Sequence, residues 1–190
     1  NDESLLTCGL LNQEAIKMKS LLFSFVLAAV FSISSFAQTS WLDRPIDRNW
    51  NDGNGVVPNA PRNVDPIDNR CREQIRTPES LADRAVTRAG WSLYGPAQTY
   101  GTVTLITAMA SVDGMCRPNE YNAFVFVANR FAGSLSPTTS VARSDGSIST
   151  VHLYDPKRIT AEFNRYTSND ALCCPSQKTF VEYSITAGPR

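Results

Sequence analysis

The residues best suited to chemistry in this sequence are two adjacent cysteines, Cys173 and Cys174, followed directly by Pro175. Neighbouring thiols can act as a redox-active dithiol, contribute to a metal site or form structural disulfides. The pair lacks the Cys-x-x-Cys spacing and the helix N-terminus that lower the pKa of a thiol. We therefore interpret both cysteines as structural cross-links rather than as reactive or metal-binding groups, and we expect no metal site.

The first forty residues predict that these cysteines reach an oxidising compartment. Residues 18–37 consist of a short basic start and an apolar run that ends on the small side chain of Ala37. This pattern predicts a secretory signal peptide cleaved before Gln38, and the apolar run is too short for a comfortable membrane span. Residues 1–17 carry acidic side chains that do not suit a leader. We interpret them as a non-native upstream extension, with Met18 as the first native residue.

Removal of this extension leaves an even number of cysteines. Of the five in the sequence, Cys8 lies in the extension, which leaves Cys71, Cys116, Cys173 and Cys174. Four cysteines in an exported chain predict two disulfides, for which three pairings are possible. In one, the adjacent cysteines bond to each other. We favour the other two, in which each of them bonds separately to Cys71 or Cys116, because neighbouring cysteines close a strained ring. The sequence does not choose between those two.

The remaining polar residues do not form a recognisable catalytic motif. A Ser-His-Asp system would have to use His152, the single histidine, yet no Gly-x-Ser-x-Gly sequence is present. The acidic residues considered for a catalytic pair are scattered along the chain: Asp145, Asp155, Glu162, Asp170 and Glu182. The sequence contains neither a phosphate-binding loop nor a dinucleotide fingerprint, so we predict no cofactor and no catalytic residue.

Composition and charge restrict the class of protein further. The chain has 190 residues, 42% of them hydrophobic and 19% charged, which is typical of one globular domain. Its formal net charge is zero at pH 7. A neutral chain has no electrostatic attraction to nucleic acid or to an anionic membrane, so we exclude both as partners.

The elements that would position these residues begin with one helix. Residues 38–69 are rich in Pro, Asn, Asp and Gly and predict an arm or linker, so the globular domain is expected over 70–190. A helix is predicted over 78–89, since apolar side chains recur there at helical spacing after Thr77 and Pro78. Gly90 is expected to end it in a left-handed conformation.

After the helix the apolar residues recur with a period of two, which predicts strands. The run 121–128, YNAFVFVA, is apolar on both faces, as in a central strand. The segments expected to be strands are 91–94, 101–112, 121–128, 131–135, 147–154, 158–166 and 179–186. The predicted fold class is α+β, with one N-terminal amphipathic helix packed on a disulfide-linked antiparallel sheet of about six strands.

Several segments resemble the LppP/LprE lipoprotein family of bacterial envelopes. They are RFAGSLSP (130–137), SDGSI (144–148), RYTSNDALCCPS (165–176) and FVEYSI (180–185). The likeness covers roughly residues 71–186, and its most specific part is the cysteine pair followed by Pro-Ser. It implies an exported envelope protein and no established biochemical activity. Many members carry a lipid on a cysteine after the signal segment, whereas Gln38 follows Ala37 here, without a lipobox cysteine.

We therefore predict a periplasmic or secreted, non-catalytic envelope protein of unknown function. It is expected to be a binding or interaction module for an envelope protein or a small ligand, with no stable membrane span after signal cleavage. The alternative is an exported enzyme, either hydrolytic or of the thiol–disulfide redox type.

Overall fold

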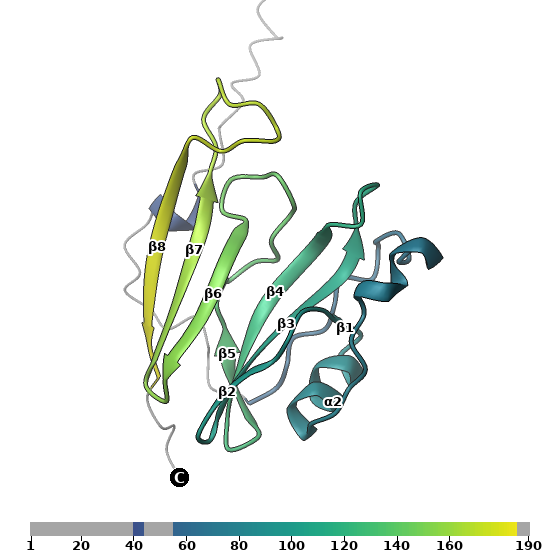
Figure 1. Ribbon diagram of the computed structural model, residues 1–190, viewed down its shortest axis with the longest axis vertical. Helices are drawn as coiled ribbons and strands as arrows, with labels where there is room; N and C mark the ends of the chain where they lie inside the picture. The colour runs from purple at the N-terminus through teal and green to yellow at the C-terminus, as the bar shows by residue number, and fades with distance from the viewer. Residues whose placement is uncertain (1–39, 44–54, 186–190) are drawn as a thin grey trace, which may run out of the picture. The chain divides into compact units, whose positions relative to one another are not determined.

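Two antiparallel sheets and one short α-helix form the domain in a computed structural model that describes residues 40–43 and 55–185 (Figure 1). The predicted upstream extension (1–17) and signal peptide (18–37) lie outside the described residues and stay predictions. No helix in the described part of the chain is long and apolar enough to cross a membrane. The helical elements are η1 (Trp41–Asp43), η2 (Asn69–Gln74) and α2 (Leu81–Arg88).

The first sheet is built around two long strands and has the order β1–β3–β4–β5, with β2 also paired to β3. Its strands are β1 (Ser92–Leu93), β2 (Gln98–Tyr100), β3 (Val103–Val112), β4 (Pro118–Val127) and β5 (Arg130–Ser134). One face packs on α2 through Ile106 and Phe124, and the opposite face presents Leu105 and Val125 to the second sheet. The prediction of a central strand with two apolar faces is confirmed by the burial of β4.

The helix is shorter than the predicted range 78–89, because a different residue caps it. Ser80 accepts a hydrogen bond from the N–H of Asp83, and the Asp83 carboxylate accepts one from the N–H of Ser80. This capping box starts the helix at Leu81, after the Thr77 and Pro78 that we expected to begin it. Gly90 adopts the expected positive φ, at 93°.

Arg76 fixes the start of α2 by pairing with the same carboxylate. Its guanidinium donates to both oxygens of Asp83 at 2.8 and 2.6 Å, and only 1% of Asp83 is exposed. Burial opposes ionisation of this carboxyl. The hydrogen bonds from Arg76 and from the N–H groups of Ser80 and Glu79 outweigh burial and hold its pKa well below the usual range.

A second sheet replaces the single sheet of about six strands that the sequence predicted. It consists of β6 (Ile148–Asp155), β7 (Arg158–Arg165) and β8 (Gln177–Ser184), in that order. Its inner face inserts Ile159 and Phe163 among side chains of β3 and β4, and Tyr121 of β4 donates to the carbonyl of Ile148 at 2.7 Å. Because β3 and β4 are apolar on both faces, one helix cannot cover them. The strands that follow β5 therefore form a second layer on the uncovered face.

A side-chain amide joins the two sheets where β2 approaches β6. Gln98 donates from Nε2 to the carbonyl of Val151 at 2.9 Å and accepts from the N–H of Leu153 at 2.8 Å. The amide thus makes the two hydrogen bonds that a neighbouring backbone segment would make to β6.

The described parts of the predicted arm, residues 38–69, lie against the domain. The ring of Trp41 meets that of Phe163 edge to face, with centroids 5.1 Å apart. Arg165 of β7 donates to both carboxylate oxygens of Asp43 at 2.8 and 2.9 Å. Further along the arm, the carbonyl of Pro58 accepts a hydrogen bond from the indole of Trp91 at 2.7 Å.

Candidate functional sites

The four cysteines bond in the pairing that the sequence analysis disfavoured. Cys71 bonds to Cys116, with Cα atoms 5.2 Å apart, and Cys173 bonds to Cys174. The prediction that the adjacent cysteines bond separately to Cys71 and Cys116 was therefore wrong. The physical reason is distance: the loop with the adjacent cysteines lies at the tip of the β7–β8 hairpin, apart from the β3–β4 hairpin that carries Cys116 (Figure 1).

The Cys71–Cys116 bond ties the segment before α2 to the β3–β4 loop. Cys71 lies in η2 and is 1% exposed. The loop around Cys116 is ordered by Asp113, whose carboxylate accepts hydrogen bonds from the N–H groups of Met115 and Arg117. Burial opposes ionisation of Asp113, but its hydrogen bonds, above all those from Arg117, lower its pKa. This disulfide therefore joins a buried cysteine of η2 to a half-buried cysteine of the β3–β4 loop.

The Cys173–Cys174 bond lies on an exposed loop, residues 166–176, which we call the cysteine loop. Both cysteines are exposed, and so is Leu172 beside them, at 68%. The carboxylate of Asp170 accepts hydrogen bonds from the N–H of Thr167 at 2.8 Å and from the hydroxyl of Ser176 at 2.9 Å. These bonds, the one from the Thr167 N–H first, lower the pKa of Asp170.

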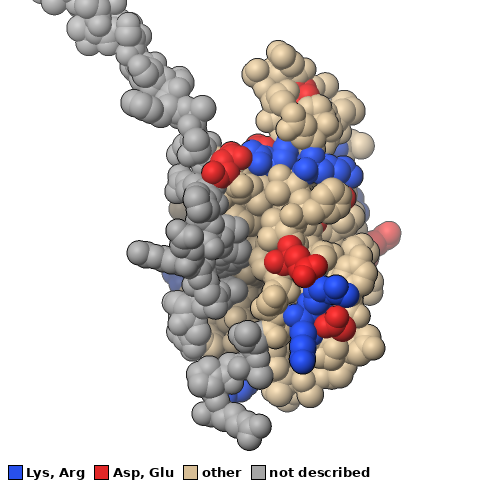
Figure 2. All heavy atoms as spheres, turned by 90° about the vertical axis from the view of Figure 1, so that its left-hand side faces the viewer, with Lys and Arg blue, Asp and Glu red and all other residues tan. Residues whose placement is uncertain are grey.

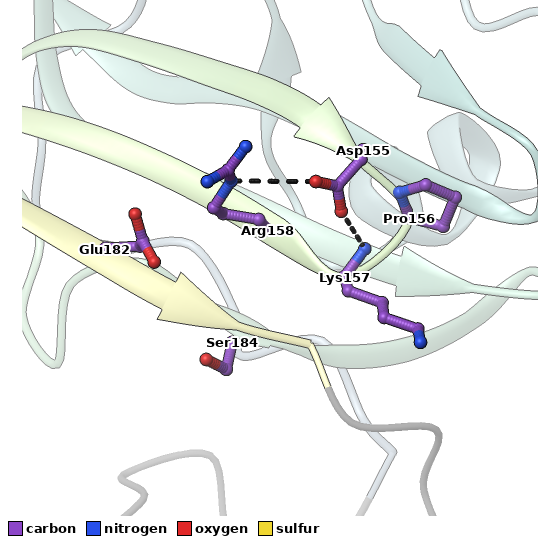
Figure 3. A pocket seen from close by; sticks show the side chains of 6 residues that line it. All are labelled: Asp155, Pro156, Lys157, Arg158, Glu182 and Ser184. Carbon is purple, nitrogen blue, oxygen red and sulfur yellow. Dashed lines mark hydrogen bonds and ion pairs between the residues drawn. The ribbon is translucent and has the colours of Figure 1, made fainter.

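An open hollow of about 570 Å³ lies at the opposite end of the second sheet, around the β6–β7 turn (Figure 3). Arg158 faces Asp155 with 3.6 Å between charged atoms, while Glu182 and Ser184 come from β8. The backbone N–H of Lys157 donates to Asp155 at 2.7 Å. The hollow thus offers cations, carboxylates and a hydroxyl, which suit a small polar group.

Asp155 and Glu182 line the same hollow, but the structure does not bring the other candidate catalytic residues to it. His152 lies exposed on β6, and its ring makes no hydrogen bond to any described residue. Glu162 pairs with Lys178 at 2.5 Å, a contact that lowers the Glu162 pKa, and Asp145 pairs with Arg165 at 2.8 Å. Among residues 40–43 and 55–185, no three His, Cys, Asp or Glu side chains are close enough to hold a metal ion.

The surface that sequence reasoning missed is the outer face of the second sheet, opposite the core. The register of the three strands puts Thr150, His152, Tyr154, Thr160, Glu162, Phe180 and Glu182 on this outer face. Phe180 is 72% exposed and Tyr154 is 56% exposed, although both are aromatic. The alternation of β8 contained the signal, since inward-facing Val181 and Tyr183 leave Phe180 outside.

Charges are mixed on this side of the molecule. Figure 2 looks onto the side where β8 lies in Figure 1, and among the described residues it shows acidic and basic side chains interspersed, without a large patch of one sign. The guanidinium of Arg158 lies 5.6 Å from the centre of the Tyr154 ring, a distance that allows cation–π attraction. The surface can therefore make aromatic, polar and charged contacts together.

Comparison with known proteins identifies one family. No curated protein and no solved structure matches the chain. The matching family model begins at residue 97, just before β2, and covers every strand of the two sheets except β1. It leaves out α2 and the segment with Cys71, which the resemblance over residues 71–186 had included. Over residues 97–188, the chain matches the model of the LppP/LprE lipoprotein family, as the sequence resemblance predicted.

Proposed function

We propose that this chain is an exported, non-catalytic envelope protein that binds a protein partner through the outer face of its second sheet. The family match supports a place in the cell envelope, and the predicted signal peptide over 18–37 supports export to the periplasm or the medium. The missing lipobox cysteine favours a form without a lipid anchor.

The exposure of Phe180 and Tyr154 on one sheet face carries this proposal. Large aromatic side chains are enriched at protein interfaces because they bury a large area with few rotatable bonds. These two project from β8 and β6, which flank β7 in the sheet, and the inner face of β7 is held in the core by Ile159 and Phe163, both 0% exposed. The partner would therefore meet a preformed surface and would order few side chains on binding.

The chemistry around the aromatic residues indicates what the partner presents. His152, Thr160 and Glu182 lie across the three strands in register and offer donors and acceptors beside the rings. Such a mixed surface suits a protein surface with apolar contacts surrounded by polar groups. A small ligand would instead use the hollow beside Arg158.

The test is site-specific photocrosslinking in cells that export the full chain. A benzophenone side chain at Phe180 or Tyr154 is expected to give the same discrete adduct, and one at Leu81 on α2 is expected to give none. Leu81 is a matched control because it is 58% exposed on a different element. Phe180→Ser should abolish the adduct formed from position 154 without changing stability by more than about 0.5 kcal/mol.

Two outcomes would contradict the proposal. The first is an adduct that forms equally well from position 81, and the second is the absence of any adduct from both outer-face positions. Binding of a small polar molecule that is lost in Arg158→Ala but kept in Phe180→Ser would move the function to the hollow.

The alternative of an exported enzyme stays a prediction in two forms. The hydrolytic form would need hydrogen-bond partners for His152, and among the described residues its ring makes no hydrogen bond and meets the Tyr154 ring at 6.0 Å between centroids. The thiol–disulfide form has one observation in its favour, the exposed position of Cys173 and Cys174.

A further inference from the structure

The two disulfides of this domain differ sharply in access to solvent. Cys71 is 1% exposed and its partner Cys116 is half-buried, whereas Cys173 and Cys174 are both exposed at the tip of the β7–β8 hairpin. A thiolate must reach a disulfide sulfur to exchange with it, so access decides which bond reacts. A reductant in solution can reach the sulfurs of the cysteine loop without unfolding the domain.

The shape of the cysteine loop is held by contacts other than its disulfide. Asp170 bonds to both ends of the loop, at the N–H groups of Thr167 and Ser176, and the hydroxyl of Tyr166 donates to the carbonyl of Leu172 at 3.3 Å. The strands on either side stay paired in register up to Arg165 opposite Gln177. Opening the bond between adjacent cysteines therefore removes no contact between the two sheets.

We propose that Cys173–Cys174 is a reversible redox site that exchanges electrons with a dithiol reductant of the exported compartment. One thiolate of the reductant attacks Sγ of either cysteine. The bond between the two cysteines breaks, and the other Sγ leaves as a thiolate that takes up a proton. The second thiol of the reductant then attacks the mixed disulfide and frees the first cysteine. Two electrons and two protons have moved to the protein, and the reductant has become a disulfide.

The adjacency of the two cysteines gives this site its particular chemistry. The leaving thiolate of one cysteine remains next to the mixed disulfide on the other, so it can reverse the first step. Partner proteins with a single thiol are therefore released, whereas dithiols complete the transfer. The reduced site presents two adjacent thiols on an exposed loop, the arrangement that a trivalent arsenical binds. This activity goes beyond partner binding on the outer face and does not depend on it.

The test uses the full exported chain, purified without reductant. It is titrated with dithiothreitol, free thiols are blocked with maleimide, and the blocked positions are mapped by peptide mass spectrometry. We expect Cys173 and Cys174 to be labelled together while Cys71 and Cys116 stay bonded. The midpoint dithiol/disulfide ratio for Cys173–Cys174 should be at least about tenfold lower than for Cys71–Cys116. The reduced protein should bind one phenylarsine oxide, and air or oxidised glutathione should restore the bond.

The variants Cys173→Ser/Cys174→Ser and Cys71→Ala/Cys116→Ala are the matched controls. The first should release no thiols at the low dithiol ratio, and the second should still release two. Three results would overturn the proposal: reduction of both disulfides at one ratio, reduction of the exposed pair only in denaturant, or a loss of strand signal in circular dichroism when that pair opens. Maleimide labelling of Cys173 or Cys174 before any reductant is added would equally overturn it.

Discussion

Removing one disulfide should destabilise this domain far more than removing the other. The two perturbations are the double variants Cys71→Ala/Cys116→Ala and Cys173→Ser/Cys174→Ser. The first opens a bond between residues separated by 45 positions, and the second opens one between neighbours, separated by 1 position. A cross-link stabilises mainly by restricting the unfolded chain, and the restriction grows with the length of the closed loop.

The magnitudes follow from these separations. In the chain-entropy model, a loop of the length closed by Cys71–Cys116 contributes about 4 kcal/mol at 25 °C, and a ring across one peptide bond contributes about 1 kcal/mol. Loss of the buried Cys71 sulfur adds to the first value, since only 1% of that residue is exposed. Typical domains are stable by about 5–15 kcal/mol, so the first variant loses a large share of the total.

The assay is equilibrium unfolding in urea, followed by circular dichroism. With a slope of about 2 kcal/mol per M, the Cys71→Ala/Cys116→Ala midpoint should fall by about 2 M. The Cys173→Ser/Cys174→Ser midpoint should fall by about 0.5 M or less. Equal losses, or a larger loss for the adjacent pair, would refute the reasoning, because the adjacent cysteines would then hold distant parts of the chain together.

Substitutions at Asp83 and Ala128, each with a control, test local features of the fold. Asp83→Asn should lower the free energy of unfolding at pH 7 by about 3 kcal/mol, because Arg76 loses its buried partner. Asp155→Asn removes the partner of Arg158 in an exposed pair and should lower it by less than about 0.5 kcal/mol. Folding lowers the pKa of Asp83, so this carboxylate stabilises the folded state above about pH 4 and loses that effect as the pH falls further. The free energy of unfolding should therefore fall less steeply with decreasing pH in Asp83→Asn than in the original protein. Ala128 and Asn129 form the β4–β5 turn with φ values of 48° and 63°, a left-handed conformation that asparagine tolerates better than alanine or valine. In urea unfolding, Ala128→Asn should therefore raise the unfolding free energy by about 0.5–1 kcal/mol, and Ala128→Val should lower it.

Local periodicity predicted every strand except β2 (Gln98–Tyr100), because each of the others carries its own signal. The alternation of Ile159, Ala161 and Phe163 favoured a strand over 158–166, and β7 confirms it at Arg158–Arg165. These three residues face the core together because successive side chains of a strand point to opposite faces of the sheet.

The number of sheets could not be read in the same way, because it depends on contacts between distant residues. The apolar character of β4 on both faces did contain a hint, since a strand buried on two sides needs a covering layer on each. Nothing in the sequence of β6 to β8 says whether these strands extend the first sheet or lie across it. The disulfide prediction failed for a different reason, since it assumed that neighbouring cysteines would avoid a strained ring, and Cys173 and Cys174 close that ring.

The candidate site was predictable in its chemistry but not in its geometry. The exposure of Cys173 and Cys174 depends on the position of their hairpin, and their adjacency alone did not reveal it. The aromatic outer face was visible as a pattern in β8, yet the sequence could not show that no other described layer covers Phe180.

The amide of Gln98 also bears on aggregation. Edge strands recruit strands of other molecules through free N–H and C=O groups, and such pairing leads to fibre growth. The carbonyl of Val151 and the N–H of Leu153 lie on the side of β6 away from β7, and Gln98 already engages both. An incoming strand would have to displace this amide before it could add to β6, so one glutamine protects that edge against intermolecular sheet growth.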